Sequence, residues 1–411
     1  MKYKKVCKIL IVILISILAG FSFLCETPNE KLQKVLIVIW NKNAFNRSIL
    51  SKNDLESYRY YNLKYLGEKV YNIQVETQKK YKPEESDIIF SVVPLKKHNY
   101  KEFKDKSTIF LLESPISNGG IENTGNFKKV FTYDSTVIDN KRYFHLMIPY
   151  FFMKPFNEIP LSDKKVFSMQ VAGNHEYKSY NLRRHLVRWF MENQPKDLLF
   201  YGNSWNNLKN DLSQKAQESF DEQYGGYVPD KIKAIRNSRF VFAFENAQHN
   251  GYISEKIFDV MLADSVPVYW GAPDIDNYVP KDCFINYEDF GSFDKLYQFI
   301  KNMSDEEYEN YRKNIRKFMK QFDQTPFFYK TFIQRVYNGI MDEPYYLVRY
   351  NNKWETLIPN NKKINRYCLE TNKKICGRIR VFNDKIISIQ WMNKLSSTYI
   401  QNKWGNYVPV K

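Results

Sequence analysis

Between residues 34 and 150 the chain repeats short apolar runs that are bounded by polar residues. The runs are KVLIVIW (34–40), YNIQVET (71–77), DIIFSVV (87–93) and STIFLLESP (107–115). Runs of this length and composition are typical of strands that are buried on both faces of a parallel sheet. Helical stretches lie between some of them, and the alternation predicts a doubly wound α/β domain.

A second series of the same kind starts at VFSMQVAGN (166–174). A basic amphipathic helix is predicted over 181–193. Strand-like runs follow at DLLFYG (197–202), RFVFAFEN (239–246), VPVYWGAP (266–273) and FINYEDF (284–290), and helices are predicted over 292–340. We therefore expect a second α/β domain that faces the first across a cleft.

Beyond about residue 345 short β-like runs alternate with turns rich in Asn and Lys, which predicts a small β-rich module. The expected domains are an N-terminal anchor (1–26), a first α/β domain (27–155), a second α/β domain (156–344) and the β-rich basic module (345–411).

The N-terminus is basic and is followed by an uncharged apolar run from Ile9 to Cys25. This pattern favours a type II membrane anchor over a cleaved signal peptide. The lysines before the run place the N-terminus on the cytosolic side. The expected location is the Golgi membrane in a eukaryote or the cell membrane in a bacterium.

The net charge is +17, from 62 Lys and Arg against 45 Asp and Glu, which suggests anionic partners. No helix-turn-helix, zinc-finger or aromatic RNA-reading motif is present, so nucleic-acid binding is not expected. Residues 342–411 carry 13 Lys and Arg against 5 Asp and Glu. Contact of this tail with a glycan or a membrane through exposed Trp354, Trp391 and Trp404 is one hypothesis. A packing module with core tryptophans is the other.

Two cysteines of the tail, Cys368 and Cys376, lie eight residues apart in a strand-rich segment. They form either a disulfide, in an oxidising compartment, or a pair of free thiols. No cysteine or histidine cluster has the spacing of a zinc site.

The segment 242–273, FAFENAQHNGYISEKIFDVMLADSVPVYWGAP, concentrates polar residues between two apolar strands. Glu245 and Asn246 end a strand, where ligands of open α/β sheets bind. Ser254, Glu255 and Lys256 open a helix, whose N-terminus favours anions. These residues indicate a site for a phosphate-bearing ligand such as a nucleotide, and an ordinary capped helix is the alternative.

A D-x-D pair, Asp274 and Asp276, follows this segment. Such pairs hold a divalent ion in metal-dependent transferases, because hard carboxylate oxygens suit Mg²⁺ or Mn²⁺. We favour a solvated turn here and expect no essential metal or other cofactor.

The order FAFEN-x(4)-GYISEKIFD-x(4)-DSVPVYWGAP resembles the signature of α-1,3/1,4-fucosyltransferases, glycosyltransferase family 10. FLLESP (110–115), RYFHLMIPY (142–150) and VAGN (171–174), which Arg183 follows, resemble further elements of that family. The resemblance implies a GT-B fold, inverting chemistry and GDP-fucose as the donor substrate. Ala247 departs from the family pattern, which has Ser at this position.

The resemblance also implies roles for individual residues. Glu113 would be the general base that takes the acceptor proton. Lys256 and Arg183 (or its neighbour Arg184) would stabilise the diphosphate charge. Glu255 would accept hydrogen bonds from the ribose. The remaining donor-binding positions are Asn174, Glu245, Asn246 and Tyr252.

The function that follows is transfer of L-fucose to a GlcNAc-type hydroxyl of an acceptor such as N-acetyllactosamine or an N-glycan. A transferase of another nucleotide sugar and a non-catalytic glycan-binding protein are the alternatives. Activity that requires a divalent metal would favour a metal site at the D-x-D pair. Activity that does not depend on Glu113 would contradict the proposed catalytic role of Glu113.

Overall fold

The structure is a computed structural model of the full chain. It describes residues 33–38, 73–77, 83–91, 102–115, 121–150, 156–172, 181–341, 346–351, 353–361, 366–369, 375–383, 386–391, 396–402 and 406–410. Glu113 and most of the expected donor site fall within these residues. Asn174 and the expected membrane anchor lie outside them. Within the described part of the chain, no helix is both long and apolar enough to cross a membrane.

The first sheet contains six strands in the order β2-β1-β3-β4-β5-β6, and every pairing in it is parallel. Its strands are β1 (Gln33–Val38), β2 (Ile73–Thr77), β3 (Ile88–Ser91), β4 (Ser107–Leu111), β5 (Lys129–Thr132) and β6 (Tyr143–His145). The apolar runs predicted β1 to β4. They did not predict β5 and β6, which are short and carry polar residues.

β4 shows how a central strand of this sheet is buried. All five of its residues are buried. Phe110 belongs to the large core on one face of the sheet, whereas Ile109 and Leu111 belong to a smaller core on the other face. Because successive side chains of a strand point to opposite faces, the apolar residues Ile109, Phe110 and Leu111 divide between the cores on the two sides of the sheet.

The second sheet contains five parallel strands in the order β11-β10-β9-β7-β8. Its strands are β7 (Val166–Val171), β8 (Leu198–Tyr201), β9 (Ser238–Phe244), β10 (Val266–Trp270) and β11 (Ile285–Asn286). The chain runs from β7 outward to β8 and then returns to the other side of β7 to form β9. The strand order therefore reverses between β7 and β9.

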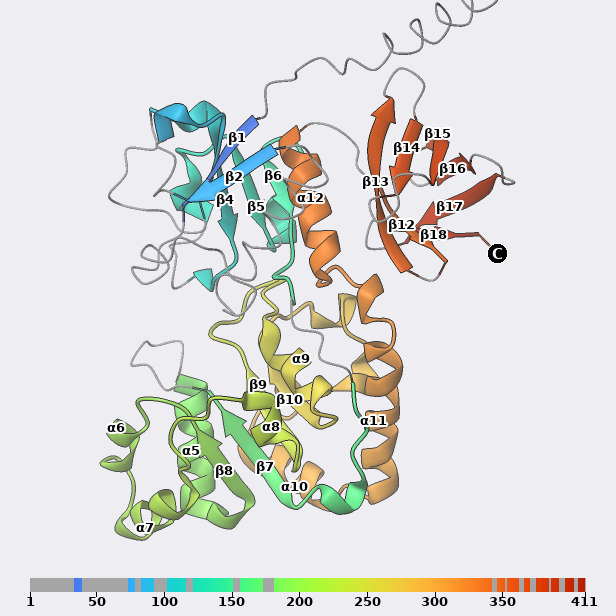
Figure 1. Ribbon diagram of the computed structural model, residues 1–411. Coiled ribbons are helices and arrows are strands. Elements are labelled where there is room, and N and C mark those ends of the chain that lie inside the picture. The colour runs from blue at the N-terminus through green and yellow to red at the C-terminus, as the bar shows by residue number, and fades with distance from the viewer. Residues whose placement is uncertain are drawn as a thin grey trace, which may run out of the picture.

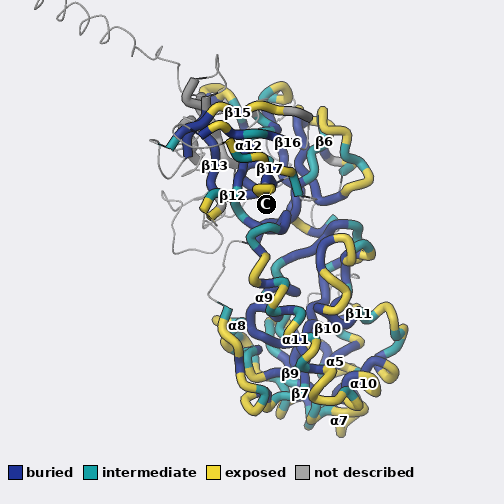
Figure 2. The backbone as a smooth tube through the Cα atoms, turned by 90° about the vertical axis from the view of Figure 1, so that its right-hand side faces the viewer, coloured by how far each residue is buried: buried dark blue, intermediate teal, exposed yellow. Residues whose placement is uncertain are grey.

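Helices follow the strands of this sheet: α5 (Asn181–Asn193), α6 (Asn206–Lys209), α7 (Gln214–Gln223), α8 (Lys231–Ile235), α9 (Glu255–Leu262), α10 (Phe293–Asn302) and α11 (Asp305–Met319). Helix α5 has the bounds that its amphipathic pattern predicted, whereas α6, α7 and α8 were not predicted. In Figure 2 the tube is dark blue along the middle of this lobe and yellow on its outer turns, as expected for a sheet buried under amphipathic helices.

Helix α12 (Tyr329–Met341) carries the chain from the second lobe back along the first sheet, as Figure 1 shows. The ammonium of Lys129, on β5, donates a hydrogen bond to the carbonyl of Gly339. A Cβ atom at Gly339 would lie 2.7 Å from the ring of Phe131, so only glycine allows this close approach. Helix α12 thus connects the second lobe with the first sheet, and no local sequence pattern predicts its contact with β5.

The end of the chain forms a closed barrel beside the first lobe (Figure 1). Its strands are β12 (Tyr346–Tyr350), β13 (Lys353–Asn361), β14 (Arg366–Leu369), β15 (Cys376–Asn383), β16 (Ile386–Trp391), β17 (Ser397–Gln401) and β18 (Tyr407–Pro409). Neighbouring strands are antiparallel except for the closing pair of β12 and β18, which is parallel. The sequence pattern did not predict this closure.

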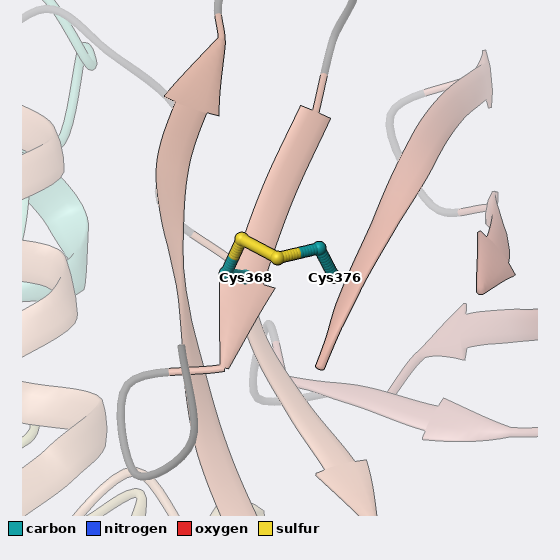
Figure 3. The surroundings of a disulfide bond; sticks show 2 residues. All are labelled: Cys368 and Cys376. Carbon is teal, nitrogen blue, oxygen red and sulfur yellow. A yellow bond between two sulfur atoms is a disulfide. The ribbon is translucent and has the colours of Figure 1, made fainter. Parts of the chain in front are cut away.

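Cys368 and Cys376 face each other across β14 and β15 and form a disulfide (Figure 3). This decides between the two alternatives left open by the sequence. Trp391 is buried in the barrel core, so the hypothesis that it is an exposed contact residue is wrong. Barrel closure places its ring on the inner face, which the local run cannot show. The side chains of Trp354 and Trp404 lie outside the described residues.

Candidate active site

The candidate site begins at the carboxyl end of β9, beside the point where the strand order reverses. Glu245 and Asn246 follow Phe244, the last residue of that strand. Because β7 and β9 are parallel neighbours, their carboxyl ends open at the same edge of the sheet. Ligands of open α/β sheets bind at such a reversal, so the polar end of β9 stands where a ligand is expected.

Glu245 is buried and its carboxylate organises the start of α9. The backbone N–H of Ser254 donates to Oε1 at 2.7 Å, and the Ser254 hydroxyl donates to Oε2 at 2.7 Å. The ammonium of Lys256 donates to Oε2 at 2.9 Å. A Cβ atom at Gly271 would lie 2.5 Å from the Glu245 side chain, so the glycine of the GAP element leaves room for the carboxylate.

Lys256 is thereby held as a fixed positive charge in the first turn of α9. Burial lowers the pKa of its ammonium, but attraction by Glu245 and Glu255 outweighs burial, and the pKa is raised. The Lys256 side chain is 17% exposed. A charge-paired lysine at a helix N-terminus, fixed in place, is suited to bind a phosphate group.

Arg183 lies in the first turn of α5, across the edge of the sheet from Lys256. Its guanidinium is buried and donates to the carbonyl of Phe244 and to Oδ1 of Asn246, the latter at 2.8 Å. It is close enough to lower the pKa of Lys256 by repulsion. The structure therefore brings Arg183, Asn246 and Lys256 together. Arg184, its neighbour, instead pairs with Asp211 on the outer side at 3.2 Å.

Tyr252 and Glu255 occupy different environments at this site. The ring of Tyr252 is 2% exposed and packs against Tyr133 of the first lobe, with ring centroids 5.3 Å apart. Glu255 is the first residue of α9, and its Oε1 lies 3.7 Å from the ammonium of Lys231. Glu255 thus stands at the rim of the site, whereas Tyr252 lies in the contact between the lobes.

Glu113 reaches the same region from the first lobe. It lies two residues beyond β4, at the carboxyl end of that strand, and it is exposed. It lines a pocket of about 180 Å³ together with Glu122, Tyr133 and Asp134 of its own lobe and His249 of the second. Its negative charge also contributes, after burial and Glu245, to the raised pKa of Tyr252. Glu113 therefore lies at the contact between the lobes, close enough to Tyr252 to influence its pKa.

Three residues of this contact were not identified from the sequence: Tyr133, Asp134 and His249. The Tyr133 hydroxyl donates to the carbonyl of Glu113 at 2.9 Å, and His249 Nε2 lies 3.6 Å from Asp134 Oδ2. Tyr133 and Asp134 directly follow β5. The rule that polar residues at strand ends mark a site would have found them if β5 had been recognised as a strand.

The D-x-D pair is engaged in local contacts. Asp274 accepts a hydrogen bond from the N–H of Gly251 at 2.7 Å, and Asp276 pairs with Lys281 at 2.9 Å. Among the residues that the structure describes, no group of three Asp, Glu, His or Cys side chains is arranged to hold a metal ion.

Comparison with known proteins adds to this geometry. Residues 165–332 match the family model described as glycosyltransferase family 10 (fucosyltransferase), C-terminal part. A mouse 4-galactosyl-N-acetylglucosaminide 3-alpha-L-fucosyltransferase 9 is 35% identical over 123 residues, which are 28% of this chain and 34% of that protein. An alpha-(1,3)-fucosyltransferase of Helicobacter pylori is 36% identical over 77 residues, or 18% of this chain and 16% of that protein. The chain thus spans about a third or less of these curated relatives.

A crystal structure of an alpha1,3-fucosyltransferase is also similar, with a TM-score of 0.48 and 17% identity, over 76% of this chain and 92% of that one. The matched residues 165–332 include the whole second sheet and the residues around Lys256. They also include the segment 242–273, which carries the motifs described above. Over residues 165–332 the chain is therefore similar to glycosyltransferase family 10.

Proposed function

We propose that this protein is an inverting α-1,3-fucosyltransferase, which transfers L-fucose from GDP-fucose to a GlcNAc-type hydroxyl of a glycan. The observation that carries the proposal is the Lys256 ammonium, which Glu245 holds beside the strand-order reversal and which lies near Arg183 of α5. The family match supports the sugar, and the name of the mouse relative supports an N-acetylglucosaminide acceptor. The two parallel sheets agree with a GT-B arrangement.

The donor diphosphate would bind at the N-terminus of α9. Lys256 supplies a point charge and Arg183 a guanidinium whose hydrogen bonds to Phe244 and Asn246 fix its position. Glu255, at the rim, would accept hydrogen bonds from the ribose hydroxyls. Asn174 is assigned to the donor by the motif alone. Cations aimed at a diphosphate stabilise the charge that develops as it leaves, which is a large catalytic term.

Glu113 would act as the general base. As the acceptor oxygen forms its bond to C1 of fucose, its proton moves to the Glu113 carboxylate, and the bond from C1 to the diphosphate oxygen breaks. Attack opposite the leaving group inverts the anomeric configuration. The Glu113 carboxylate can take this proton only if the acceptor hydroxyl lies within hydrogen-bond distance, so the pocket around Glu113 would hold the acceptor.

Charge on the leaving diphosphate would be compensated by the two cations of the protein, so no divalent metal is required in this proposal. The hypothesis of an N-terminal membrane anchor stays a prediction, as do the Golgi or cell-membrane location and the four domain boundaries.

The test measures GDP release from GDP-fucose in the presence of N-acetyllactosamine and a panel of glycan acceptors, with and without EDTA. We expect acceptor-dependent release that EDTA does not reduce and that Glu113→Gln lowers at least 100-fold. Glu122→Gln is the matched control, because Glu122 lines the same pocket and is not proposed to transfer a proton. Release from another nucleotide sugar alone would contradict the fucose assignment, and full activity of Glu113→Gln would contradict the base.

A further inference from the structure

The segment 225–230 crosses the open edge of the second sheet. It starts beside the carboxyl end of β8, where the N–H of Gly225 donates to Phe200 at 3.0 Å and the N–H of Gly202 donates to Gly226 at 2.8 Å. It ends at Lys231, whose ammonium lies 3.7 Å from Glu255 at the start of α9. Because β7 lies between β8 and β9, the segment passes the end of β7.

The backbone of this segment is tightly specified. A Cβ atom at Gly225 would lie 1.9 Å from the ring of Tyr201, and Gly226 has a φ of +69°, which favours glycine. Two consecutive glycines therefore let the chain lie against β8. Pro229, close to the end of the segment, restricts its backbone further.

Tyr227 projects from this fixed segment and is 71% exposed, the most exposed large hydrophobic side chain among those described. Four residues later the chain reaches Lys231. The ammonium of Lys231 lies 3.7 Å from Glu255, the residue proposed to bind the ribose. The carboxyl ends of β8 and β9 are two strand spacings, about 10 Å, apart. A nucleotide whose diphosphate lies at Lys256 and whose ribose lies at Glu255 would thus extend its base toward Tyr227.

We propose that Tyr227 binds the nucleobase of the donor by stacking its ring on the base. This inference rests on the proposed function and names a residue for it that the family signature does not contain. An aromatic ring stacks on the face of a nucleobase with little dependence on the base, so Tyr227 supplies affinity for the nucleoside and contributes little to the choice among bases. It touches no reacting atom and is a binding residue only.

The experiment compares the full chain with Tyr227→Ala, Tyr227→Phe and Phe299→Ala by calorimetric titration with GDP and with inorganic pyrophosphate. We expect Tyr227→Ala to weaken GDP binding roughly 5- to 150-fold and to leave pyrophosphate binding unchanged, because pyrophosphate has no base. Tyr227→Phe keeps the ring and should bind GDP normally. Phe299, 41% exposed on α10, is a control for loss of an exposed ring elsewhere.

In turnover assays the Tyr227→Ala variant should show a raised KM for GDP-fucose with kcat unchanged. Normal GDP binding by Tyr227→Ala, beside a wild type that binds GDP, would overturn the stacking proposal alone. Equal weakening of GDP and pyrophosphate would also overturn it, since the effect would then be on the phosphate site. A wild type that binds neither ligand would overturn the proposed function, and this inference with it.

Discussion

At the scale of single residues, the pairing of Glu245 with Lys256 does two things. It neutralises a carboxylate that is fully buried, and it fixes the ammonium at the edge of the sheet. Stability and ligand binding at this site are therefore coupled through one ion pair, and substitution can separate them.

Lys256→Met should lower GDP-fucose turnover at least 100-fold and the free energy of unfolding by about 3 kcal/mol, because it leaves Glu245 buried without its partner. The double variant Glu245→Gln/Lys256→Met removes both charges and should regain most of the stability, but none of the turnover. Urea unfolding and the GDP-release assay measure the two effects. Recovery of turnover in the double variant would contradict a direct role for the ammonium.

His145, at the end of β6, should make stability depend on pH. Burial, and after it repulsion by Arg335, lowers the pKa of its imidazole from 6.5 to about 4. In the unfolded chain the imidazole of His145 is therefore protonated below pH 6.5, whereas in the folded chain it is protonated only below about pH 4. Stability from this group is fully present above pH 6.5 and is lost as the pH falls toward 4, by on the order of 3 kcal/mol.

Urea unfolding at several pH values between 7 and 4 measures this dependence. His145→Gln should reduce the slope, and His185→Gln, at an exposed position of α5, should not. An unchanged slope in His145→Gln would assign the acid sensitivity to other groups.

At the scale of secondary-structure elements, the hydrophobic pattern predicts strands and helices well where each face of the element keeps the same environment along its length. β4 and α5 are examples, since β4 is buried along its whole length and α5 has a clear apolar stripe. β5 and β6 were missed because they are three or four residues long. At that length a pattern carries little information, and their pairing in the sheet determines their structure.

The disulfide between β14 and β15 is expected to stabilise the barrel by constraining the unfolded chain. Its partners are 8 residues apart, and closing so short a loop is worth about 2.5 kcal/mol. Cys368→Ser/Cys376→Ser should lower the free energy of unfolding by about this amount and leave turnover unchanged, since none of the barrel residues that the structure describes lines the pocket at Glu113.

Thermal unfolding with and without a reductant is the measurement. The reductant should destabilise the wild type and have no effect on the double variant. A reductant effect of equal size in both proteins would assign it to another group.

At the scale of the whole molecule, the site exists because two lobes meet. Gly251 allows this contact, since its φ is +74° and a Cβ atom there would lie 2.2 Å from the carbonyl oxygen of Tyr133. Tyr150 adds a hydrogen bond of 2.9 Å from the first lobe to Asp259 on α9. Glu113 and Tyr252 are far apart in the chain and come near each other through this contact between the lobes.

Helix α12 offers a test of how strongly the lobes are joined. Gly339→Ala improves helix propensity by about 1 kcal/mol but forces a methyl group against the ring of Phe131, which costs about 1–3 kcal/mol. We expect a net loss of about 1 kcal/mol in urea unfolding. Gly125→Ala is the control, because no atom lies within 4 Å of its Cβ position. A variant more stable than the wild type would show that the packing there relaxes freely.

The sequence by itself determined the α/β class, most strands of the two parallel sheets and the polar cluster from Glu245 to Lys256. These features follow from local periodicity and from residue types at fixed spacing, and both depend only on residues that are close together in the sequence. Tertiary structure alone decided that Tyr133 and His249 join Glu113, that Tyr252 is buried between the lobes and that Trp391 lies inside a closed barrel. It also decided that Tyr227 is exposed. Each of these features depends on contacts between segments that are far apart in the chain. The local sequence pattern of a segment does not show which other segment packs against it.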